Sequence, residues 1–129
     1  MLIVDSSVWI QAFRVDASFE GREVDRLLAR GDVGMVGVVL TEVLQGARSA
    51  QEFESLRIRF MAIPYLEETQ ETWVRVGNLS YQLRQRGQAI GIVDLLIAAL
   101  ALEHGCAVYT LDEHFQRIPG LQIYSPEPQ

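Results

Sequence analysis

Leu2-Ile3-Val4-Asp5-Ser6-Ser7-Val8-Trp9-Ile10 is a stretch whose hydrophobic pattern changes at one acidic residue. The three apolar residues before Asp5 are typical of a short strand buried on both faces. The apolar residues after Asp5 have helical spacing, and Ser6 or Ser7 is a residue type that caps a helix N-terminus. The stretch therefore predicts a buried strand that ends at Asp5 and leads directly into a helix.

Strand and helix patterns alternate along the rest of the chain. Further strands are expected at 33–36, 62–63, 107–110 and 121–124, and helices at 19–30, 39–46, 52–61, 67–86, 93–103 and 113–118. This alternation predicts an α/β fold with a mostly parallel central sheet flanked by helices. The chain has 129 residues, which suits one domain over 1–124 and a loose tail over 125–129.

The composition limits the classes of function. The chain has 17 acidic residues against 11 basic ones, a net charge of −6, which argues against a protein that simply coats nucleic acid. Every basic residue is Arg, and there is no Lys. The one cysteine, Cys106, excludes an internal disulfide and suits a reducing cytoplasm. No apolar run is long enough to span a membrane and no basic leader is present, so we expect a cytoplasmic protein.

Four acidic residues stand where the expected strands give way to helices. Asp5 ends the first strand, and Glu42 lies in the first turns of the helix after the second strand. Asp94 begins the apolar helix 93–103, and Asp112 follows the strand 107–110. Because the carboxyl ends of parallel strands share one edge of a sheet, these four side chains are expected to converge.

Each acid alone has an ordinary explanation as a helix cap or as a charge that offsets the helix dipole. That explanation is weakest for Asp94, which is set among apolar residues where an uncompensated charge is costly. A cluster of four carboxylates needs a counter-charge, and this chain has no Lys to supply one. Oxygen ligands of this kind suit Mg²⁺ or Mn²⁺, which would support phosphodiester hydrolysis.

Four stretches, one around each acid, resemble the acidic motifs of PIN domains. They are residues 2–10, 39–47, 90–101 and 109–115, and their order and spacing are similar to those of VapC toxins over nearly the whole chain. The resemblance implies a PIN-like three-layer sandwich in which Asp5, Glu42, Asp94 and Asp112 surround Mg²⁺ or Mn²⁺. It also implies endoribonuclease activity on RNA, a VapB-type antitoxin as partner, and a homodimer that forms a heterotetramer or larger assembly with that antitoxin.

Three further polar residues are secondary candidates for the site. Ser7 and Thr110 lie beside acids and either is able to hold a metal-bound water, although we expect Ser7 to cap its helix. His114 takes the place of an Asp that many PIN domains carry, so it is a candidate for contact with metal or phosphate; a plain polar residue at a helix start is the simpler interpretation. Three arginines are candidates for phosphate contact: Arg14, Arg48 and Arg117.

Three other interpretations stay open from the sequence. A phosphoaspartate receiver or phosphatase-like domain also places an Asp after its first strand, but it normally needs a Lys that this chain lacks. A catalytically inactive PIN-like binding module would keep the fold without the chemistry. A structure-specific DNA nuclease would share the metal chemistry, but such proteins are usually longer.

Overall fold

The computed structural model describes residues 1–129, and its centre is a parallel sheet. The strands β1 (Leu2–Val4), β2 (Val33–Gly34) and β3 (Ala107–Tyr109) lie in the order β2-β1-β3. Leu2 pairs with Val33 on one side and with Ala107 on the other. The central strand is therefore the one nearest the N-terminus, and it joins segments from both ends of the chain.

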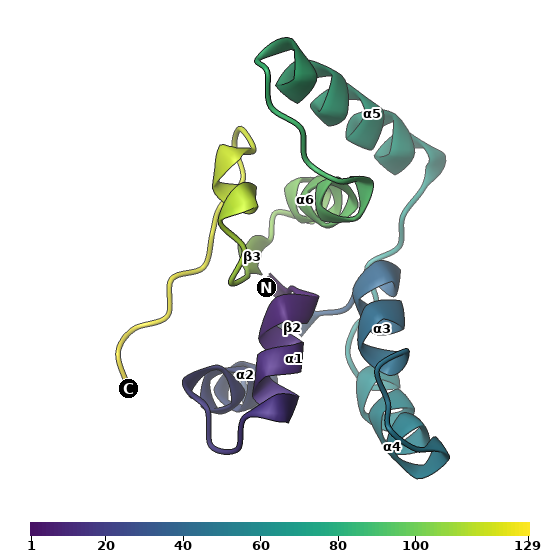
Figure 1. Cartoon of the computed structure of the whole chain (residues 1–129), viewed down its shortest axis with the longest axis vertical. Helices are drawn as coiled ribbons and strands as arrows, with labels where there is room; N and C mark the ends of the chain where they lie inside the picture. Colours follow the sequence, from purple (N-terminus) through teal and green to yellow (C-terminus); the bar gives the residue numbers. More distant parts are fainter.

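Helices cover both faces of this sheet, which confirms the three-layer α/β arrangement (Figure 1). The helices α1 (Ser6–Arg14) and α2 (Phe19–Ala29) lie on one side, and α6 (Ile92–His104) lies on the other with α5 (Gln70–Gln85) outside it. The helices α3 (Gly37–Leu44) and α4 (Ala50–Met61) form a pair beside α1. A short 3₁₀ helix, η1 (Glu113–Arg117), follows β3.

The core is built around α6 and the central strand. Ile3 and Val4 of β1 are at most 1% exposed, and the run Leu95–Ala101 of α6 is buried throughout. Cys106 is buried beside them, as its apolar surroundings suggest. A helix that is apolar on all sides is stable in water only when it is covered by other elements. Burial of α6 therefore fixes where its first turn, and with it Asp94, meets the sheet.

Trp9 fastens α1 to the central strand. Its indole is 1% exposed, and Nε1 donates a hydrogen bond to the carbonyl oxygen of Val4 at 3.1 Å. The ring also packs against Phe13 of α1 and Phe60 of α4, with centroid separations of 5.9 and 4.9 Å. Since Asp5 lies between Val4 and the first turn of α1, these contacts hold the backbone of Asp5 in place.

Glu23 is a buried acid that joins α2 to the C-terminal segment. It is 2% exposed, forms an ion pair with Arg26, and accepts a hydrogen bond from the Tyr124 hydroxyl at 2.9 Å. Burial raises the pKa of Glu23, but the hydrogen bonds from Arg26 and Tyr124 outweigh it, so the net pKa is below its usual value. Further along, the Gln129 amide donates to the carbonyl of Phe19 at 3.0 Å.

Two expected strands differ in the structure. Residues 62–63 finish α4, because Ala62 is the residue that caps its C-terminus and the Ile63 amide donates to the Phe60 carbonyl. The segment after α4 pairs with the sheet only at Tyr65, which forms a single parallel bridge with Met35. The expected strand 121–124 is likewise reduced to one bridge, between Val108 and Ile123. The strand expected at 62–63 is therefore wrong, and that at 121–124 is too long.

Two helix starts also differ from expectation. Neither Ser6 nor Ser7 caps α1: Asp5 occupies the cap position, and its side chain makes no capping hydrogen bond. The helix expected over 67–86 begins at Gln70, because Thr69 and Thr72 form a reciprocal capping box there. The other helices lie within a few residues of their predicted ranges. No helix is both long enough and apolar enough to cross a membrane.

Candidate metal centre

Asp5 lies at the carboxyl end of the central strand and is almost fully buried. It is 4% exposed, and its backbone amide donates to the carbonyl of Tyr109 on β3 at 2.8 Å. Its carboxylate oxygen Oδ2 accepts hydrogen bonds from the hydroxyls of Ser7 and Thr110, both at 2.8 Å. The side chain is thus fixed by one neighbour on α1 and one from the segment after β3.

The two hydroxyls are themselves oriented by backbone amides. The Leu111 amide donates to Ser7 Oγ at 3.1 Å, and the Asp112 amide donates to Thr110 Oγ1 at 3.0 Å. Because these amides occupy acceptor positions, each hydroxyl proton is directed to Asp5. Ser7 therefore orients Asp5 and does not cap α1, and Thr110 has the same role from the other side of the site.

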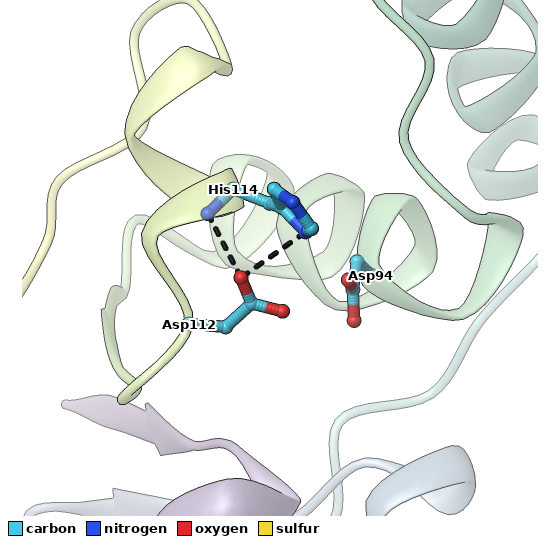
Figure 2. Close-up of side chains that lie close together, drawn as sticks. All are labelled: Asp94, Asp112 and His114. Atoms are coloured by element: carbon cyan, nitrogen blue, oxygen red, sulfur yellow. Dashed lines mark hydrogen bonds and ion pairs between the residues drawn. The ribbon is translucent and has the colours of Figure 1, made fainter.

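Asp94, Asp112 and His114 lie together at the same edge of the sheet. Their potential ligand atoms are all within 4.8 Å of one another. Asp112 precedes η1, and its Oδ1 accepts a hydrogen bond from the His114 backbone amide at 2.9 Å and lies 3.2 Å from the ring Nδ1 of His114. Figure 2 shows Asp94 facing this pair from the first turn of α6. His114 lies in the first turn of η1, close to the expected helix start, and its ring is close enough to Asp94 and Asp112 to share a metal ion with them.

Glu42 is the acid that comes from α3. It is partly buried, and its Oε1 accepts a hydrogen bond from Ser6 Oγ at 3.2 Å. Sequence reasoning treated Ser6 only as a capping residue, and its contact with Glu42, 36 positions away, had no local signal. Ser6 thus connects Glu42 to the same α1 start that holds Asp5.

The electrostatics of Asp94 indicate that the four acids form one group, which we call the acidic centre (Asp5, Glu42, Asp94 and Asp112). Burial raises the pKa of Asp94, and the negative charges of Asp5, Asp112 and Glu42 raise it further. His114 opposes this shift only in part. The structure therefore brings Asp94 and Asp112 together with His114, whereas Asp5 and Glu42 lie near enough to affect the charge of Asp94 but outside that close cluster.

No arginine compensates the acidic centre. The arginine ion pairs of the chain go to other acids: Glu23, Asp32, Glu54 and Glu103. Carboxylate oxygens with one nearby imidazole fit a hard divalent ion such as Mg²⁺ or Mn²⁺, and they fit soft metals poorly because no thiolate is present. The residues present thus fit a divalent cation.

An open pocket of about 440 Å³ adjoins the acidic centre. Ser7, Asp112, His114 and Arg117 contribute to its lining. Arg117, at the end of η1, forms no ion pair with a carboxylate. The pocket therefore places one unpaired guanidinium beside the acids, where a phosphate group would be accepted.

Comparison with known proteins gives consistent results. The family model of the PIN domain matches residues 2–121. Ribonuclease VapC11 of Mycobacterium tuberculosis is 31% identical over 97% of this chain and 98% of that protein. Ribonuclease VapC1 of Rickettsia felis is also 31% identical, over 95% of this chain and 93% of its own. The solved structure of VapBC2 from Rickettsia felis, bound to a DNA fragment from their promoter, has the same fold: the TM-score is 0.80, with 21% identity and 98% of both chains covered.

Proposed function

Since this chain belongs to the PIN-domain family and to its VapC ribonucleases, we propose that it is an endoribonuclease that depends on Mg²⁺ or Mn²⁺. The acidic centre would hold the ion, and residues 1–124 would form the nuclease domain. A phosphoaspartate receiver or phosphatase is set aside, because the PIN model covers nearly the whole chain.

The observation that carries this proposal is the environment of Asp94. Its carboxylate is partly buried, faces three other acids, and has no arginine partner. Like charges gathered in this way destabilise a fold unless a cation or shared protons offset them. A site that retains four such acids is therefore better suited to binding a divalent ion than to a purely structural role.

The chain's own residues would position the reacting groups. A bound divalent ion would lower the pKa of a water molecule and offset negative charge that develops on the phosphate. Ser7 and Thr110 hold Asp5 in one orientation, and His114 holds Asp112. Arg117 would contact a phosphate from the adjoining pocket. These contacts fix the geometry before RNA binds, which is what an efficient catalytic site requires.

The direct test is cleavage of total bacterial RNA by the purified chain. We expect cuts with Mg²⁺ or Mn²⁺ and none with EDTA. Because the proposed nucleophile is water and not the ribose 2′-hydroxyl, the products should carry 5′-phosphate and 3′-hydroxyl ends. Mapping of both ends by adaptor ligation, with and without phosphatase treatment, checks this. Products with 2′,3′-cyclic phosphate would contradict the mechanism, and an inert chain would favour the non-catalytic binding module.

We further propose that a VapB-type antitoxin inhibits this chain, since chains of the same fold have been solved as VapBC assemblies. An arginine of such a partner would reach the acidic centre and compete with the metal. Expression of this chain alone should slow bacterial growth, and co-expression of its VapB-type antitoxin should restore it. Expression of the Asp94→Asn variant is the matched control and should be harmless. Normal growth with well-expressed wild-type chain would contradict the toxin assignment.

We also propose that the chain forms a homodimer, which would assemble with its antitoxin into a heterotetramer or larger complex. Large apolar side chains are exposed on α5 and at the start of α6, among them Trp73, Val74, Ile92 and Val93. The start of α5 contacts Glu103 at the end of α6, so these side chains lie at both ends of the α5–α6 pair. A partner that covers this pair of helices would bury them.

A further inference from the structure

A groove of about 1020 Å³ runs between α1 and the α3–α4 pair. Arg14 at the end of α1, Arg48 before α4, and Arg59 in the last turn of α4 all line it. Glu42 lines the same groove, so it opens onto the acidic centre. The groove reaches the acidic centre at Glu42, and the pocket lined by Arg117 reaches it at Asp112.

The three groove arginines are exposed and unpaired. None forms an ion pair, whereas Arg26, Arg30, Arg57 and Arg75 elsewhere in the chain each have an acidic partner. The remaining groove acid, Glu52, is engaged at the start of α4, where it accepts from the Arg48 backbone amide at 3.3 Å. The chain as a whole has a net charge of −6, but this groove carries three arginines without acidic partners, and such a concentration of positive charge attracts anions.

The groove also presents an aromatic ring. Phe13 is 37% exposed, and the guanidinium carbon of Arg59 lies 5.8 Å from its centroid. Proteins that bind single-stranded nucleic acid combine cations that contact the backbone with aromatic faces on which bases stack. Here Phe13 already stacks with Trp9 and has Arg59 over its ring, so it forms an apolar side of the groove and positions Arg59.

We propose that this groove holds the backbone of a single-stranded RNA segment and leads it to the acidic centre, with Arg14, Arg48 and Arg59 contacting phosphates. The proposal rests on the ribonuclease function above. Guanidinium groups bind phosphate with two parallel hydrogen bonds, which fixes the strand's position as well as its affinity. The three arginines of the groove match a polyanion, and occupation of the groove by an antitoxin segment is one outcome of the test below.

The test compares two double variants with the same change in net charge. Arg48→Gln/Arg59→Gln removes two groove cations, and Arg84→Gln/Arg86→Gln removes two arginines at the end of α5, away from the groove. Binding of a labelled random-sequence single-stranded RNA pool is measured in Ca²⁺, a non-catalytic substitute, across a range of salt concentrations. Circular dichroism checks that both variants are folded.

Each lost phosphate contact should reduce the salt dependence of binding by about 0.7 in the log–log slope. The groove variant should therefore have a slope shallower by about 1.4 and bind roughly 25-fold more weakly at about 0.1 M salt. Its KM for RNA should rise more than its kcat falls in Mg²⁺. The α5 variant should keep the wild-type slope, affinity and KM.

Three results would overturn the inference. If the two variants bind RNA alike, the groove does not hold the strand, although cleavage by the wild type would leave the nuclease function intact. If the groove variant keeps its RNA affinity but no longer binds the antitoxin, the groove is the antitoxin site. If the wild-type chain neither binds nor cuts RNA, the proposed function fails together with the groove.

Discussion

Replacement of Asp94 by asparagine should reduce RNA cleavage by more than about a hundredfold, because loss of even an outer-shell partner of a metal ligand costs 10- to 100-fold. The metal-free variant should at the same time be as stable as the wild type or more so. Burial and three neighbouring acids raise the pKa of Asp94, so the folded chain favours its protonated form. Because the pKa is raised on folding, the acid opposes folding increasingly as the pH rises above the ordinary aspartate value, and asparagine removes this penalty.

The measurements are single-turnover cleavage rates and urea unfolding in EDTA. Asp25→Asn on α2 is a matched control, since it removes one exposed carboxylate outside the acidic centre. It should leave the cleavage rate unchanged. An Asp94→Asn enzyme that cleaves RNA within a few-fold of the wild-type rate would mean that the acidic centre is not the catalytic site.

Truncation of Trp9 to alanine should lower the free energy of unfolding by about 3–5 kcal/mol, as is usual for a buried tryptophan. The indole is 1% exposed, packs between Phe13 and Phe60, and donates to Val4, whose carbonyl would lose this partner. Domains of this size are stable by only about 5–15 kcal/mol, so a large part of the total would be lost.

Two other variants separate packing from the hydrogen bond. Trp9→Phe keeps an aromatic ring and should lose about 1 kcal/mol for the missing N–H donor, plus a smaller packing loss. Trp73→Ala, at a position 48% exposed on α5, should change the stability far less than Trp9→Ala. Equal losses in urea unfolding at positions 9 and 73 would contradict the anchoring role of Trp9.

The sequence predicted correctly the elements that are buried on all sides, because such elements consist of uninterrupted apolar residues. The run before Asp5 and the apolar helix after Gly91 are buried on all sides, and both lie where the sequence placed them. The sheet edges were not predictable in the same way. Each is one bridged residue, Tyr65 or Ile123, held by backbone hydrogen bonds that leave no side-chain signature. A two-residue apolar run at 62–63 looked like a strand but completes α4.

The acids of the candidate site were predictable because parallel strands bring their carboxyl ends to one edge. The side chains that orient those acids were not. The hydroxyl of Ser7 has the local features of a cap, yet its role is set by Thr110 and Leu111, more than a hundred positions later. His114 similarly looks like a surface residue until Asp94, from another helix, is placed beside it.

The position of β1 between β2 and β3 has a consequence for synthesis on the ribosome. Asp5 is among the first residues to be made, yet its amide and carboxylate are held by Tyr109 and Thr110. A nascent chain that ends before Tyr109 lacks both Asp112 of the acidic centre and these two contacts to Asp5. The acidic centre is thus completed only after the segment that follows β3 has left the exit tunnel, so it does not exist while the ribosome is still translating the body of this chain.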